Sequence, residues 1–169
     1  MADPRIRPFR GAIAAFATMV ALVMATGAVL FARKLGLRPA DVEAFYLGGG
    51  EMARARSLAG MLEVAVPHLL ATPIVLFVTL HLVAFAWRAR RRPFAVLAGV
   101  SFGCALAGIA GGFAIRWVWP GLAVVKIAAF VGLEATMLLW LGLLVTAIAP
   151  PTGREARSDE PQAVPGPAR

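Results

Sequence analysis

Cysteine, histidine and charge are all scarce in this chain. The single cysteine, Cys104, excludes an intramolecular disulfide and any metal centre built from several cysteines. With two histidines and no recognisable pairing of a nucleophile with a base, hydrolase chemistry is not expected, and the isolated chain is not expected to be an enzyme. Only 15% of the residues are charged, whereas soluble domains carry about a quarter. The chain therefore lacks the charged surface of a water-soluble protein.

Hydrophobic residues make up 60% of the sequence, and they gather in four continuous runs. Each run reaches the roughly 20 residues that a helix needs to cross a hydrocarbon core. The runs do not alternate in polarity as the strands of a membrane barrel would. We therefore predict an all-α integral membrane protein, a four-helix antiparallel bundle in the lipid bilayer. The predicted spans are about residues 11–32, 62–87, 94–118 and 122–149.

The net charge of +8 comes from arginines that border the apolar runs, so nucleic acid is not expected as a partner. Short loops rich in arginine stay in the cytoplasm. Four arginines between the second and third spans outweigh the pair Arg33 and Lys34 after the first. We expect residues 1–10 and a proline-rich, disordered tail at 150–169 in the cytoplasm, and the loop 33–61 outside. The arginines on the expected cytoplasmic side are Arg5, Arg7, Arg10, Arg88, Arg90, Arg91, Arg92, Arg154, Arg157 and Arg169.

The first run has an alternative interpretation as a cleaved signal peptide. Its apolar stretch continues to Ala32, which is longer than the core of a signal peptide, so an uncleaved helix is expected. In the outer loop, Pro39 predicts the start of a short helix that runs through Tyr46. The glycine triplet at 48–50 should end that helix.

The two histidines lie in the second predicted span, 13 residues apart. Imidazole is a common ligand of haem iron, so His68 and His81 are candidate axial ligands of a b-type haem. On a straight helix they would lie about 20 Å apart and about 140° apart around the axis, so one chain cannot place both on one haem. Pro67 and Pro73 can bend the helix and change this angle. The alternative is that the histidines pack against other helices or relay protons.

A haem at His81 would need a second ligand. Met19 and Met137 are the weaker candidates, because both are expected near the depth of His81 and a thioether can ligate haem iron. Otherwise a second chain must supply the ligand.

Ionisable residues inside lipid are functional candidates, because they are costly there unless they are paired. Glu134 is expected near the bilayer midplane, either protonated or hydrogen-bonded to another helix, and Glu63 near the start of the second span. Lys126 is expected to extend its ammonium toward the outer surface. Cations near that surface could bind haem propionates, a quinone head group or lipid phosphate. They are Arg54, Arg56, Arg116 and Lys126.

Small residues recur every four positions in the third predicted span, at Gly99, Gly103, Ala107 and Gly111. A line of small residues lets helix backbones approach closely in a membrane, and it also leaves room for a flat cofactor. Close helix packing is the expected role of this line.

The stretch from Tyr46 to Leu82 contains "SLAGMLEVAVPHLL" and "TLHLVAF" after a tyrosine–glycine loop. It resembles a group of small bacterial four-span proteins of unknown function, in which a leucine–glutamate pair precedes a His-x-His motif and another histidine lies lower in the helix. The resemblance marks Glu63, His68 and His81, with Val66 where the first histidine of the motif would fall. It implies a multi-pass protein of the bacterial inner membrane. The architecture also resembles that of cytochrome b-type four-helix proteins.

Three functional hypotheses follow. The first is a small inner-membrane electron-transfer or respiratory-chain accessory protein that binds b-type haem through His81 or His68. The second is a non-enzymatic subunit or assembly factor of a membrane complex, with other subunits or a second copy docked on the glycine face of the third span. The third is a small proton-coupled carrier that uses Glu134 and the histidines.

Overall fold

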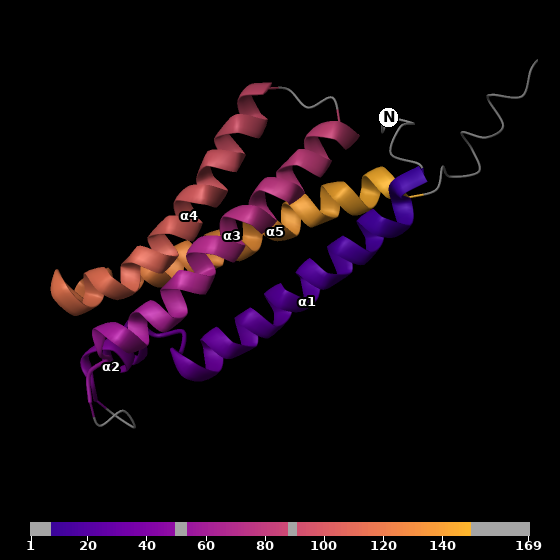
Figure 1. Ribbon diagram of the computed structural model, residues 1–169. Helices are drawn as coiled ribbons and strands as arrows, with labels where there is room; N and C mark the ends of the chain where they lie inside the picture. The colour runs from indigo at the N-terminus through magenta and orange to yellow at the C-terminus, as the bar shows by residue number, and fades with distance from the viewer. Residues whose placement is uncertain (1–7, 50–53, 88–90, 150–169) are drawn as a thin grey trace, which may run out of the picture.

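The computed structural model describes residues 8–49, 54–87 and 91–149, and it confirms the prediction of an all-α membrane protein. No strand forms among these residues, and four helices are long and apolar enough to cross a membrane. Figure 1 shows them as a bundle in which successive spans run in opposite directions. The helices are α1 (Arg10–Lys34), α2 (Pro39–Leu47), α3 (Leu58–Ala86), α4 (Arg91–Trp117) and α5 (Ala123–Ile148), with a 3-10 turn, η2 (Pro120–Leu122), before α5.

Several sequence predictions concern residues outside the described ranges. The expected tail at 150–169 is one of them, and so are Arg5, Arg7, Arg88 and Arg90 of the expected cytoplasmic side. The orientation of the bundle in the membrane therefore stays a prediction.

Helix α3 is longer at its start than the predicted membrane span. The helix begins at Leu58, four residues before the predicted span 62–87, because Ser57 caps it. The Ser57 hydroxyl oxygen accepts a hydrogen bond from the Gly60 N–H at 3.2 Å, which satisfies one of the free donors of the first turn.

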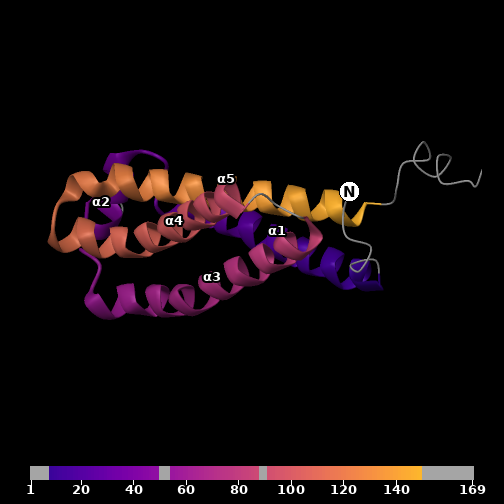
Figure 2. The ribbon, with the colours of Figure 1, turned by 90° about the horizontal axis from the view of Figure 1, so that it is seen from above.

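Two prolines, Pro67 and Pro73, lie inside α3, and the helix continues through both. Each removes one backbone hydrogen bond and favours a bend. Figure 2 shows the first half of α3 standing apart from the other helices and the second half turning toward them. The burial pattern agrees, because most of the buried residues of α3 lie from Leu76 onward.

The main core lies between α4, α5 and the second half of α3, around Trp140. The Trp140 Nε1–H donates to the Ser101 hydroxyl at 3.0 Å, and that hydroxyl donates to the Leu97 carbonyl at 2.9 Å. The Phe94 ring meets the Trp140 ring edge-on. Because lipid is as apolar as the core, these packing contacts and hydrogen bonds hold the helices together.

Helix α1 lies along α5 at the side of the bundle. Its buried residues, Ile13, Ala17 and Val20, all belong to its first half. In its second half the Phe31 ring stacks on the Phe130 ring of α5 at 4.0 Å between centroids. Helix α1 is therefore attached to the bundle mainly through α5.

The short helix α2 covers one end of the bundle, which we call the α2 end. The end of α1, the start of α3, the end of α4 and the start of α5 all lie at this end. Val42 of α2 is completely buried against Ile115 and Ala123. The start at Pro39 matches the sequence prediction, and the helix ends at Leu47, one residue beyond the predicted Tyr46. Gly48 has φ +85 at the end of the helix, a value that glycine adopts without strain.

Candidate functional site

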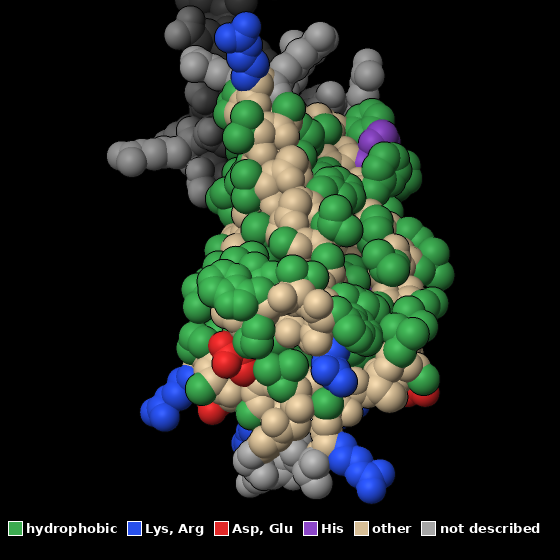
Figure 3. All heavy atoms as spheres, turned by 90° about the vertical axis from the view of Figure 1, so that its left-hand side faces the viewer, with side chains coloured by type: hydrophobic (Ala, Val, Ile, Leu, Met, Phe, Trp, Pro, Cys, Tyr) green, Lys and Arg blue, Asp and Glu red, His purple; other side chains and the backbone are tan. Residues whose placement is uncertain are grey.

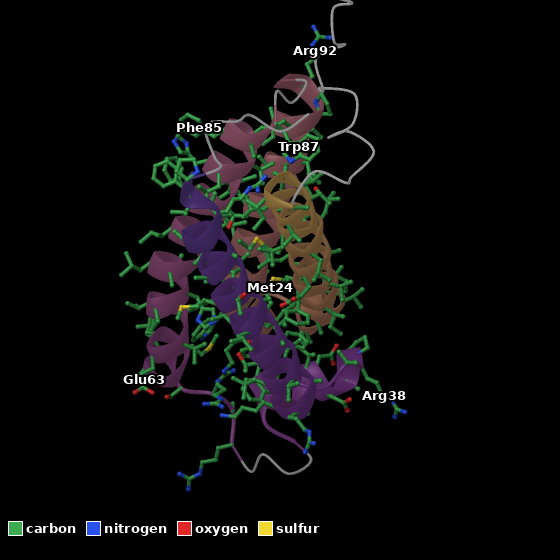
Figure 4. The ribbon with its side chains drawn as sticks, turned by 90° about the vertical axis from the view of Figure 1, so that its right-hand side faces the viewer. Met24, Arg38, Glu63, Phe85, Trp87 and Arg92 are labelled. Carbon is green, nitrogen blue, oxygen red and sulfur yellow. The ribbon has the colours of Figure 1, made fainter. Side chains whose placement is uncertain are left out.

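His81 lies on the outer face of α3 and is exposed. Its ring lies between those of Phe77 and Phe85, one turn away on either side, with centroid distances of 5.6 and 4.8 Å. Figure 4 shows Phe85 projecting away from the bundle, and Figure 3 shows histidine surface among hydrophobic side chains. The imidazole therefore faces the surroundings of the bundle and not its interior.

His68 is exposed as well, in the first half of α3. Its Nδ1 lies 2.7 Å from the carbonyl oxygen of Val64, one turn earlier in the same helix. A carbonyl only accepts, so Nδ1 carries the proton in this contact and Nε2 is left as the acceptor or ligand atom.

The structure does not bring the weaker ligand candidates to His81. Met137 is buried in the core of α5 with 5% of its surface exposed, whereas His81 points outward. Met19 is 71% exposed on α1, a different helix. A haem at His81 with a second protein ligand therefore calls for a residue of another chain.

The intramembrane carboxyl groups also lie apart from one another. Glu134 is half-buried on α5. Glu63 is exposed near the start of α3, and Figure 4 shows it at the outer edge of the α2 end.

Lys126 departs from the sequence expectation. Only 8% of its surface is exposed, and its ammonium donates a 2.6 Å hydrogen bond to the carbonyl oxygen of Gly108 on α4. Gly108 lies about two and a half turns before the end of α4. The side chain therefore points along α4 into the bundle, and the expected extension toward the outer surface is wrong. Its ammonium also lies 5.4 Å from the centre of the Tyr46 ring, a cation–π contact.

The glycines of α4 explain how a lysine and a tyrosine fit here. A Cβ added to Gly111 would lie 3.2 Å from the Lys126 Cβ, and one added to Gly112 would lie 2.9 Å from three atoms of the Tyr46 ring and hydroxyl. Glycine is thus needed at these two positions for the close approach of α5 and α2.

The predicted line of small residues needs a correction on this basis. Gly111 is buried, and Ala107 is half-buried. Gly99 and Gly103 are exposed, and a Cβ added to either would meet nothing within 4 Å. Packing within the chain uses Gly111 of this line and Gly112 beside it, whereas a Cβ added to Gly108 would meet nothing within 4 Å.

Tyr46 was not among the candidate site residues of the sequence, although the stretch that carries the family resemblance begins with it. Its backbone carbonyl accepts a 3.1 Å hydrogen bond from the Arg56 N–H, and the Arg56 guanidinium lies 4.4 Å above the neighbouring Phe45 ring. Burial raises the pKa of the Tyr46 hydroxyl to about 12, and the nearby charge of Arg56 opposes part of that rise. Its position before a glycine triplet was another signal in the sequence.

The remaining candidate cations lie at the same end. Arg54 is exposed, and Arg56 and Arg116 are half-buried. The Nε atoms of Arg56 and Arg116 are buried without a hydrogen-bond partner. Gly108, Gly112 and Arg116 follow one another at intervals of four, so Arg116 continues the face of α4 that meets Lys126 and Tyr46. The basic residues at the α2 end outnumber Asp41, Glu43 and Glu63, so this region carries a net positive charge.

Comparison with known proteins gives one match. A family model described as a transmembrane helical domain matches residues 36–155, a range that starts after the end of α1 and contains α2 to α5. No curated protein and no solved structure matches the chain. Four apolar helices and this match together make the chain a multi-pass membrane protein, and it belongs to the transmembrane helical domain family.

Proposed function

We propose that this protein is an integral-membrane subunit that works in association with a second transmembrane polypeptide, and that a helix of this partner covers the outer face of α3 around His81. The observation that carries the proposal is the exposed His81 imidazole between Phe77 and Phe85 on that face.

The reason is the cost of a polar ring in lipid. His81 comes five residues before the end of α3, which is about 8 Å along the helix axis. Both ring nitrogens need hydrogen-bond partners, and hydrocarbon offers none. An imidazole is too short to reach the headgroups as a lysine does. A partner helix with a hydrogen-bonding side chain at this depth would supply what lipid does not.

A second feature also favours a close neighbour. Gly99 and Gly103 are open on the surface of α4, and small residues one turn apart are common where transmembrane helices meet. The described part of the chain does not use this surface for its own packing.

The proposal is tested with a photoreactive amino acid placed at Phe77 in native membranes, and at Val23 as the control. Val23 is 69% exposed on α1. We expect a discrete polypeptide adduct from position 77 that weakens in a His81→Leu background, and lipid adducts from position 23. Equal yields of the polypeptide adduct from the two positions would contradict the proposal. So would an adduct from position 77 whose yield is unchanged in the His81→Leu background.

Electron transfer through b-type haem is a second candidate, and the outward direction of His81 is what favours it. One chain offers one histidine at each depth. A second copy related by a two-fold axis along the membrane normal would bring its own His81 to the same depth, so one haem could take one ligand from each copy. In that form the protein would serve as a small accessory of a respiratory chain in the inner membrane.

The absorption spectrum of the protein purified from membranes tests the haem candidate. The expected result is a Soret band with about one haem for two chains, lost in His81→Ala and kept in His68→Ala, which lies at the other depth. Protein that yields no haem on pyridine extraction rules the candidate out and leaves the subunit proposal standing.

A further inference from the structure

Three cations, Arg56, Arg116 and Lys126, lie at the α2 end, whereas His81 lies near the other end of α3. The ammonium of Lys126 lies 5.4 Å from the Tyr46 ring. The backbone of Arg56 is hydrogen-bonded to the Tyr46 carbonyl. Arg116 is one turn beyond Gly112 on α4, and the Tyr46 ring occupies the space beside Gly112 where a Cβ would lie. The three side chains come from α5, the α2–α3 connection and α4, so only the folded bundle brings them together.

These cations are incompletely paired within the described residues. The Lys126 residue is nine-tenths buried, and its ammonium makes one hydrogen bond among the described residues, to the neutral carbonyl of Gly108. The Nε atoms of Arg56 and Arg116 are buried with no hydrogen-bond partner. A buried charge without a counter-ion is strongly unfavourable, so an anion at this point would stabilise the fold.

We infer that the α2 end binds a phosphate group, with Arg56 and Arg116 as the direct contacts and with Lys126 as a fixed positive charge beneath them. A guanidinium presents paired N–H donors that match the oxygens of a phosphate, which favours phosphate over chloride. The ammonium sits in a low-dielectric interior where its field is weakly screened.

The position suits two sources of the same chemistry. The α2 end lies where the spanning helices α3, α4 and α5 begin or end, at the level where phospholipid headgroups lie. Arg38 and Arg54 are exposed at the same end, so a free phosphate or a phosphorylated solute is the other source. The probes are therefore phosphatidylglycerol, an anionic lipid, and inorganic phosphate in solution.

The test is the thermal unfolding midpoint of the full chain in a neutral detergent. A ligand at a hundredfold excess over its Kd raises the midpoint of a chain of this size by roughly 5–10 °C. We expect phosphatidylglycerol to do so and phosphatidylcholine not to. Arg116→Gln and Lys126→Met should each lose more than half of the rise. Arg38→Gln, which removes the same charge from an exposed residue at the same end, should keep it.

Each outcome decides the question. A rise with inorganic phosphate over chloride at equal ionic strength assigns the site to a soluble phosphate, and a rise with phosphatidylglycerol alone assigns it to a lipid headgroup. No rise with either probe overturns the inference, as does a loss in Arg38→Gln equal to that in Arg116→Gln. If Arg116→Gln does not fold, Arg56→Gln in the α2–α3 connection takes its place with the same expectation.

Discussion

Replacing Gly132 by alanine should strain the contact between α5 and α4. A Cβ at this position would lie 2.8 Å from the sulfur of Cys104, roughly 1 Å inside the ordinary contact distance. Overpacking of this kind costs about 1–3 kcal/mol, and the better helix propensity of alanine returns up to about 1 kcal/mol. We expect Gly132→Ala to lower the free energy of unfolding by about 1–2 kcal/mol.

The same contact allows a compensating change. Cys104→Ala alone should cost up to about 1 kcal/mol, because it removes the sulfur of a half-buried side chain. In the double variant the new methyl group occupies the space of the sulfur, so its stability should approach that of the parent chain. Gly142→Ala is the matched control on α5, since an added Cβ there meets nothing within 4 Å.

The assay is unfolding in mixed micelles with rising denaturing detergent, followed by tryptophan fluorescence. Two results would refute the reasoning. One is a Gly132→Ala variant as stable as Gly142→Ala. The other is a double variant whose loss equals the sum of the two single losses, which would mean that the two positions do not interact.

Two further predictions concern buried polar groups. Tyr46 is the sole tyrosine, so tyrosinate absorbance should report a pKa of about 12 in the folded protein, and Arg56→Gln should move it higher because the opposing charge is gone. Because the pKa of Tyr46 is higher in the folded than in the unfolded chain, the free energy of unfolding is unaffected below pH 10 and falls as the pH rises through 12, by at most about 3 kcal/mol. A tyrosine that titrates near pH 10 in the folded protein contradicts this prediction. Ser101→Ala should cost about 1–2 kcal/mol in detergent unfolding, because the buried Trp140 Nε1–H loses its acceptor. Adding Trp140→Phe should then cost less than it does in the parent chain, and full additivity contradicts the hydrogen bond.

The number and approximate limits of the helices could be predicted from the sequence. A span in lipid must satisfy all of its backbone hydrogen bonds internally, so a continuous apolar run of sufficient length predicts a helix. Local chemistry also predicted α2, where Pro39 starts the helix and Gly48 follows its last residue. Helix α3 begins before its continuous apolar run, because Ser57 caps it at Leu58.

The directions of the candidate side chains could not be predicted. Each spanning helix is apolar around its whole circumference, because lipid and the bundle core demand the same kind of residue. The pattern therefore does not tell which face of α3 carries His81 outward, or which face of α5 turns Met137 inward.

The sequence by itself determined that this protein spans a membrane with four helices, because length and hydropathy are properties of each run alone. The tertiary structure decided which residues meet. Lys126 points into the bundle and not toward the surface, because Gly111 and Gly112 leave the space for it and for Tyr46, and Gly108 supplies its acceptor. That space exists only where α2, α4 and α5 come together, and contact across three helices is not encoded in the composition of any one of them.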